Sequence, residues 1–199
     1  MRTQHVVAAA VTTLGLFASA GLAQGVVSVR HTAEFRASTY TASAQEEPAL
    51  AVAPDGSFAV VWSSRRQQEG RYGSYMQRFD ARGVAVGRET PLHLWTKSHA
   101  MAPVMDFAPD GSAWAAWQSS GQDGSANAVI ARRFDADGVG GSEILVNERT
   151  EGEQLSPVLA TLPDGGAVLA WTTAIPGETE RVAMRVFNAD GTARTGEMV

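Results

Sequence analysis

The tripeptide Pro-Asp-Gly occurs three times in this chain of 199 residues, at intervals of 55 and 54 residues. Other landmarks keep the same frame: a proline precedes each copy by six residues, and an Asp/Asn-Ala-Xaa-Gly tetrapeptide follows further on. A tryptophan stands eight residues after the proline of each tripeptide, at Trp62, Trp117 and Trp171. Four landmarks in register three times indicate a tandem repeat, in which each copy needs its neighbours to bury its apolar face.

Each copy is predicted to contain four short β-strands separated by turn signals. The first strand lies between the two prolines, the second ends at the frame tryptophan, the third ends at a phenylalanine, and the fourth is weaker. The expected strands are 49–53, 58–62, 72–79 and 88–94 in the first copy, 104–108, 113–117, 127–134 and 142–146 in the second, and 158–162, 167–171 and 181–187 in the third. The Asp-Gly pair between the first two strands predicts a hairpin with a type I′ turn.

Four strands in about 50 residues, repeated in tandem, are typical of a β-propeller blade. The second strand is apolar on both faces, as in 58–62, which fits a sheet buried between neighbouring blades. A tryptophan that recurs in every blade is explained more simply by packing between blades than by sugar stacking. We therefore predict an all-β, β-propeller-like fold of three tandem four-stranded blades.

The repeat resembles those of secreted and surface-attached bacterial proteins, in which Pro-Asp-Gly, a following tryptophan and an Arg-Phe-Asp-Ala-Xaa-Gly turn recur. The last element stands here at 78–83 and 133–138, and the third copy departs from it with Val186 and Asn188. The resemblance covers residues 48–199 and implies a propeller. It implies little about activity, because propellers host many functions.

Three blades are fewer than the four to eight of an ordinary closed propeller. One alternative is that the strand-like run 26–35 closes the ring as a donated strand. Another is a homo-oligomer in which two chains complete a six-bladed ring. We expect a third, an open arc or a fragment of a longer protein, whose end faces expose apolar residues of the second strands. These residues are Phe58, Val60, Val168 and Leu169.

The first 23 residues are predicted to be a cleaved secretory signal peptide, which makes the protein secreted, periplasmic or exposed at the cell surface. Arg2 gives the positive start, 6–18 is too short an apolar run to span a bilayer, and small residues offer cleavage before Gly21 or Gln24. The alternative is a buried N-terminal helix or an uncleaved anchor. The expected domains are the signal peptide (1–23), an N-terminal segment with one strand (24–47), and blade repeats at 48–102, 103–156 and 157–199, the last incomplete.

Composition excludes several classes of site. With 16 basic and 21 acidic residues the net charge is −5, which argues against nucleic-acid binding. The absence of cysteine excludes disulfides, a thiol nucleophile and a zinc site with Cys ligands. The turn 135–138 is similar to a calcium loop but lacks its further acidic ligands, and no phosphate-binding glycine loop or Gly-x-Ser-x-Gly is present. No metal, cofactor or membrane-spanning segment is expected.

The loops after the second strands and the loops between copies differ from copy to copy, and both lie on one face of a propeller. A ligand is expected on such variable loops, because they are carried by a fixed scaffold. The candidate ligand-binding residues belong to the first pair of loops: Arg65, Arg66, Arg71, Trp95, Lys97 and His99. Trp95 would be a stacking platform and the cations would bind an anionic or sugar ligand. The alternative is a solvated loop with scattered charge.

The second inter-copy loop is acidic, with Glu148, Glu151 and Glu153. Paired carboxylates would suit a glycoside hydrolase, whereas acidic residues in a loop also serve solubility alone. The leading hypothesis is an exported, non-catalytic propeller-type protein that binds an unidentified protein or glycan or acts as a scaffold. The alternative is a glycan-active propeller enzyme, sialidase- or lyase-like, or a fragment of one. The Asp-box of sialidases spaces its Asp and Gly differently, which weakens that alternative.

Overall fold

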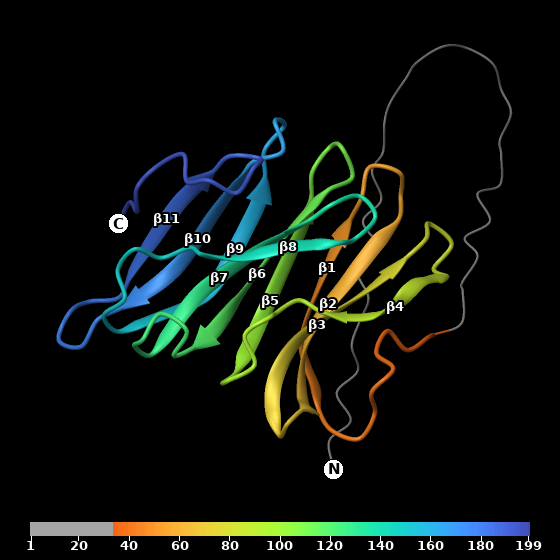
Figure 1. Cartoon of the computed structure of the whole chain (residues 1–199), viewed down its shortest axis with the longest axis horizontal. Helices are drawn as coiled ribbons and strands as arrows, with labels where there is room; N and C mark the ends of the chain where they lie inside the picture. Colours follow the sequence, from red (N-terminus) through yellow and green to blue (C-terminus); the bar gives the residue numbers. More distant parts are fainter. Residues whose placement is uncertain (1–33) are drawn as a thin grey trace, which may run out of the picture. The chain divides into compact units, whose positions relative to one another are not determined.

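The computed structural model describes residues 34–199, of which 36–199 form one compact unit. Regular secondary structure in this part is β-strand, arranged as three antiparallel sheets (Figure 1). The strands are β1 (Gln45–Val52), β2 (Phe58–Gln68), β3 (Arg71–Phe79) and β4 (Ala85–Pro91) in the first sheet, β5 (Ala100–Phe107), β6 (Ala113–Ser120), β7 (Asn127–Phe134) and β8 (Gly140–Leu145) in the second, and β9 (Glu153–Thr161), β10 (Ala167–Ala174) and β11 (Arg181–Phe187) in the third. The expected signal peptide lies outside the described residues, as does the run 26–35 except for Glu34 and Phe35, which are not in a strand.

The sheets are the blades predicted from the repeat, and we name them blade 1 (β1–β4), blade 2 (β5–β8) and blade 3 (β9–β11). Within each blade the strands are hydrogen-bonded in sequence order. Among residues 34–199, blade 3 has no regular fourth strand, and 193–198 is instead joined to β11 by two isolated bridges. The second strands continue beyond the frame tryptophan, because the residues after it stay paired with the first strands, as Ser64 does with Gln45.

The turns between first and second strands are present, but their predicted type is wrong. The Gly56 N–H donates to the Ala53 carbonyl at 2.9 Å, so that Pro54 and Asp55 are the central residues. Only Gly56 in this turn has a positive φ, of 84°. The turn is therefore of type I, because the proline ring fixes φ near −65° at its first central position and moves the turn one residue earlier than expected. The equivalent turns of the other two blades repeat this geometry.

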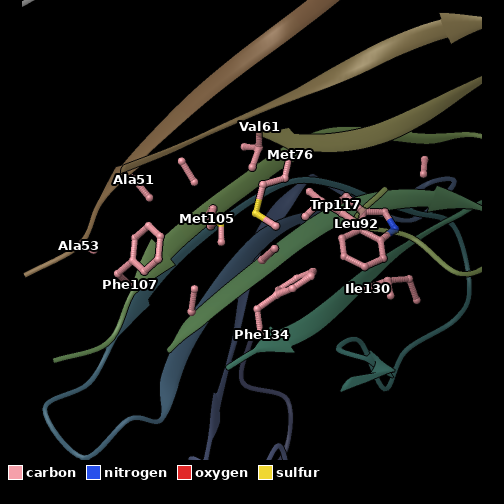
Figure 2. Close-up of a cluster of buried hydrophobic side chains, with 14 of the residues drawn as sticks. Ala51, Ala53, Val61, Met76, Leu92, Met105, Phe107, Trp117, Ile130 and Phe134 are labelled. Atoms are coloured by element: carbon pink, nitrogen blue, oxygen red, sulfur yellow. The ribbon is translucent and has the colours of Figure 1, made fainter. Parts of the chain in front are cut away.

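Two clusters of buried side chains fill joint 1, between blades 1 and 2, and joint 2, between blades 2 and 3. In each joint the first strand of the following blade lies against three strands of the preceding blade, β5 against β1–β3 and β9 against β5–β7. Joint 1 holds Trp117, which is 0% exposed (Figure 2), and joint 2 holds Trp171. Packing explains both tryptophans. Trp62 is also buried but belongs to neither cluster and lies beside Ala37 and Ser38.

The residues expected on the end faces are placed correctly except for one. Phe58, Val60 and Val168 are half-buried. Leu169 is fully buried in joint 2, because it alternates with Val168 along β10 and shares the face of Trp171. The face of a blade toward the preceding blade is called its front below, and the other face its back.

Arginines that precede the phenylalanine of a third strand tie each blade to the next. Arg78 of β3 donates to the Ala136 carbonyl in the last turn of blade 2 at 2.7 Å. Arg133 of β7 donates in the same way to the Ala189 carbonyl of blade 3. The third copy has Val186 at this position. The Arg-Phe-Asp-Ala-Xaa-Gly element is therefore an inter-blade connection, in which the arginine of one copy binds the turn of the next.

A second set of arginines connects each blade to the preceding one. Arg132 of β7 donates to the Leu92 carbonyl of blade 1 at 2.9 Å, and Arg185 of β11 donates to the Val146 carbonyl of blade 2 at 3.0 Å. Blade 1 has Gln77 at this position, and its amide donates to two carbonyls of its own blade. Both sets of connecting residues therefore change at the end blades.

Candidate functional site

The variable loops meet on one side of the sheets, which we call the loop face. In blade 1 the Tyr72 backbone N–H, near the start of β3, donates at 3.2 Å to Nδ1 of His99, which precedes β5. In blade 2 the side-chain amide of Asn147 donates to the Asp123 carboxylate at 3.0 Å. The first bond connects the start of a third strand, and the second the loop before a third strand, to the segment that leads to the next blade. The opposite side, the turn face, carries the glycine turns.

Tyr72 is the centre of one group of side chains on the loop face of blade 1. The Arg65 guanidinium carbon lies 6.0 Å from the centroid of its ring. The His99 ring lies 5.9 Å away, tilted by 60°. The phenol hydroxyl of Tyr72 donates to the Glu46 carboxylate at 3.3 Å. This group therefore combines an aromatic ring with cationic, imidazole and carboxylate groups.

Trp95 and Lys97 form a second group beside the first. The Lys97 ammonium lies 5.0 Å from the centroid of the Trp95 ring, within cation–π range. The Trp95 backbone N–H donates at 3.1 Å to Glu143 of β8, which fastens this segment to blade 2. Arg71 precedes Tyr72 in β3, and its guanidinium lies 3.5 Å from the carbonyl of Thr96, between Trp95 and Lys97 in sequence.

Four of the six predicted ligand-binding residues fall into these two groups, Arg71 lies beside the second, and Arg66 belongs to neither. The Arg66 carbonyl accepts a bond from the Tyr40 hydroxyl at 3.3 Å, while its side chain is exposed. Tyr72 and Glu46 are the residues that sequence reasoning missed. Tyr72 counts as a strand residue in the repeat pattern, and its position next to the loop is the only signal for it.

The acidic residues of the second inter-blade loop are held in separate structural contacts. Glu148 pairs with the Arg185 guanidinium at 2.6 Å. Glu153 accepts from the backbone and side-chain amides of Asn127, at 3.2 and 2.7 Å. Glu151 is exposed. This arrangement does not support a paired-carboxylate site in that loop.

Hydrogen bonds lower the pKa of several carboxyl groups in the turns. The Ser57 hydroxyl and N–H hold the pKa of Asp55 below its usual value, and the Val84 N–H does the same for the pKa of Asp80. A general acid for glycoside cleavage needs a raised pKa, so these turns do not supply one. Asp135, in the turn similar to a calcium loop, accepts from the Val139 N–H at 2.8 Å. Within residues 34–199, no three His, Asp or Glu side chains gather as a metal ion would need.

His93 is a buried titratable group that the sequence pattern does not single out. It is 4% exposed, with Nδ1 at 3.0 Å from the Ser74 carbonyl and Nε2 against the amide of Gln68. The Tyr75 ring packs edge-on against it, with centroids 5.8 Å apart. Gly73 makes room, because a Cβ there would lie 2.7 Å from His93 Cε1. Burial lowers the pKa of His93, which keeps the ring neutral at neutral pH.

Comparison with known proteins identifies the fold. No family model and no curated protein sequence matches the chain. A protein of unknown function from Dyadobacter fermentans is similar in structure, with a TM-score of 0.55 and 17% identity over 80% of this chain and 41% of that chain. The GH93 α-L-arabinofuranosidase of Fusarium graminearum gives 0.53 and 11%, over 76% and 53% of the two chains. The Hadza microbial sialidase gives 0.54 and 13%, over 75% and 36%.

The two hydrolases have β-propeller folds, and the likeness agrees with the blades described above. The chain spans about half or less of the length of these structures. Identities this low show the fold alone, since propellers carry many activities. The chain is therefore an all-β, propeller-like protein. The part of the chain that the structure describes also contains no helix long and apolar enough to cross a bilayer.

Proposed function

We propose that this chain is an exported, non-catalytic binding protein of propeller type, whose ligand lies on the loop face of blade 1. The sequence pattern of residues 1–23 supports export to the periplasm, the cell surface or the medium. The ligand is a glycan or a protein, and an anionic glycan matches the loop face best. The argument for this class rests on the side chains that meet there.

The observation that carries the proposal is that three separate segments meet at Tyr72. Glu46 of β1 and Arg65 of β2 contact its hydroxyl and ring, and His99 reaches it from the segment before β5. Trp95 adds a second half-buried ring. Aromatic rings give flat apolar surfaces for sugar rings, and guanidinium groups bind carboxylates in charge-assisted hydrogen bonds. A sialylated oligosaccharide has both features.

The test is calorimetric titration of the full chain with sialyllactose and with lactose. We expect binding of sialyllactose and much weaker binding of lactose, because only the former has a carboxylate for the arginines. Replacement of Tyr72 or Arg65 by Ala should weaken binding at least about tenfold, which corresponds to about 1.4 kcal/mol. Arg88→Ala, an exposed arginine of β4, is the matched control and should bind normally. Full affinity in Arg65→Ala would contradict the proposed site.

One observation favours a glycan-active enzyme as a second candidate. The Tyr72 hydroxyl is bonded to the Glu46 carboxylate at 3.3 Å, and a hydroxyl next to a base is the arrangement of an activated nucleophile. Sialidases use a tyrosine in this role. Hydrolysis of a fluorogenic sialoside that disappears in Tyr72→Phe would establish the enzyme and overturn the non-catalytic proposal. Binding of sialyllactose without turnover agrees with the binding protein.

A further inference from the structure

The internal joints show how a blade face is covered in this molecule. In joint 1, β5 brings Met105 and Phe107 against the back of blade 1, where they are 8% and 9% exposed. Figure 2 shows Met105 near Met76 and Phe107 near Ala51, within one buried cluster. The first strand of a following blade is therefore the main element that packs on the preceding one.

The same positions at the front of blade 1 are open. Leu50 and Val52 of β1 correspond to Met105 and Phe107, counted from the first proline of each repeat, and they are 62% and 59% exposed. The preceding segment covers only part of this front, since Ala37 and Ser38 lie beside Val60 and Trp62. It is fastened further on, where Thr39 bonds to β4 and the Tyr40 hydroxyl bonds to the end of β2. Within residues 34–199, Leu50 and Val52 of β1 therefore stay exposed at the front of blade 1.

The back of blade 3 is also open and apolar. Val182 of β11 is 69% exposed and Val158 of β9 is 59% exposed. The equivalent of Val182 in blade 2 is Val129, which is 0% exposed in joint 2. On this face Val186 replaces the arginine of the other copies, which adds apolar surface. Exposed apolar patches of this kind mark interfaces.

We propose that the front of blade 1 packs against the back of blade 3 in a second copy of this chain, so that two chains form a closed six-bladed ring. A second copy is the occupant because it supplies both missing partners, in the back-to-front order already used at joints 1 and 2. A head-to-tail contact that closes after two subunits leaves neither end face exposed. Six blades lie within the usual range of four to eight.

The proposed contact between the front of blade 1 and the back of blade 3 of the other chain, which we call the closing joint, differs from joints 1 and 2 in its polar contacts. Its residues at the arginine positions are Gln77 and Val186, so neither inter-blade arginine bond can form there. No unpaired charge is buried at these positions either, which suits an apolar contact that opens and closes. Dilution should therefore separate the two chains while the sheets of each chain stay folded.

The chain has no cysteine, so introduced single cysteines report contacts between copies. Leu50 and Met184 hold the positions of Met105 and Met76, which belong to the same cluster in joint 1. Oxidation of a mixture of Leu50→Cys and Met184→Cys chains should give a disulfide-linked dimer, twice the chain mass of 21.0 kDa. The double variant Met76→Cys/Met105→Cys should form the corresponding bond within one chain, which checks that these positions allow a disulfide.

Val84→Cys mixed with Met184→Cys is the matched control. Val84 is also exposed, at 57%, but it lies at the turn between β3 and β4 and not on β1. Light scattering of the unmodified full chain should give a dimer that becomes a monomer on dilution. Val182→Asp should be monomeric throughout, with the circular dichroism of the parent. A parent monomer at every concentration, cross-linking no better than the control, or Leu50→Cys pairing mainly with itself would overturn the proposal.

Discussion

Blade 1 and blade 2 are built on the same frame, and their differences show how neighbours decide the role of equivalent positions. Both have four strands in the same order and the same glycine turns. Blade 2 is packed on two sides, and its Arg132 reaches blade 1, whereas blade 1 has Gln77, which bonds within its own sheet. The second residue after the last strand is Asn147 in blade 2 and His93 in blade 1. Turns and apolar strands thus define the sheet, while residues at its edges depend on what each blade faces.

The largest difference between the two blades is expected at the frame tryptophans. Trp117→Ala leaves a cavity between two sheets and should lower the free energy of unfolding by about 3–5 kcal/mol. Trp62→Ala should cost less, because Trp62 borders an open cavity of about 130 Å³ rather than a second sheet. Urea unfolding of both variants measures the difference. A larger loss for Trp62→Ala would contradict the distinction between a packed and an unpacked front.

An exchange of the residues at the backward connection should give the next largest effect. Arg132→Gln removes the bond to the Leu92 carbonyl in a buried setting and should lower the free energy of unfolding by about 1–3 kcal/mol. The reverse exchange, Gln77→Arg, cannot form this connection, because blade 1 has no preceding blade among the described residues. It also removes the two amide bonds of a side chain that is 3% exposed, so it should lower the free energy of unfolding as well. Thermal or urea unfolding of the pair tests this. A gain of stability in Gln77→Arg, or no loss in Arg132→Gln, would contradict the role given to this connection.

The fold was predictable from the sequence because its signals are local. Pro-Asp-Gly and Asp-Ala-Xaa-Gly contain the proline, the side-chain acceptor and the glycine that their turns need, and they recur often enough to fix every blade. The predicted type I′ turn is wrong because that prediction rests on the Asp-Gly pair alone and leaves out the constraint that the preceding proline places on φ. The role of Arg78 and Arg132 could not be predicted, since their acceptors lie 58 and 40 residues away in sequence.

The candidate site was predictable only in part. The alternating direction of the strands places variable loops together, which points to Trp95 and His99 without any contact being known. Tyr72 was missed because a strand pattern does not show which ring will lie at the edge of a sheet. The burial of His93 depends on its close approach to Gly73, and none of the repeated sequence landmarks indicates this contact.

His93 should make stability depend on pH in a way that Asn147 cannot. Burial lowers the pKa of His93 in the folded chain below its value of about 6.5 in the unfolded chain, while Glu143 and Arg132 act on it in opposite directions. The unfolded state therefore binds more protons between these two pKa values. The stabilisation is complete above pH of about 6.5 and decreases as the pH falls through the folded-state pKa. His93→Asn should flatten this part of a plot of unfolding free energy against pH, and an unchanged plot would contradict the assignment.

The smallest effect on stability is expected from Arg65, the arginine of blade 1 that lies on the loop face. Its side chain is exposed and contacts the Tyr72 ring at 6.0 Å, whereas Arg132 of blade 2 is 9% exposed and holds a carbonyl across joint 1. Arg65→Ala should therefore change the free energy of unfolding by less than about 0.5 kcal/mol, while it weakens sialyllactose binding. Arg132→Gln should do the reverse, with reduced stability and unchanged binding. Urea unfolding and calorimetric titration of both variants separate the two roles. If Arg65→Ala destabilised the chain as much as Arg132→Gln, the loop face would be part of the scaffold, and the binding proposal would lose its main support.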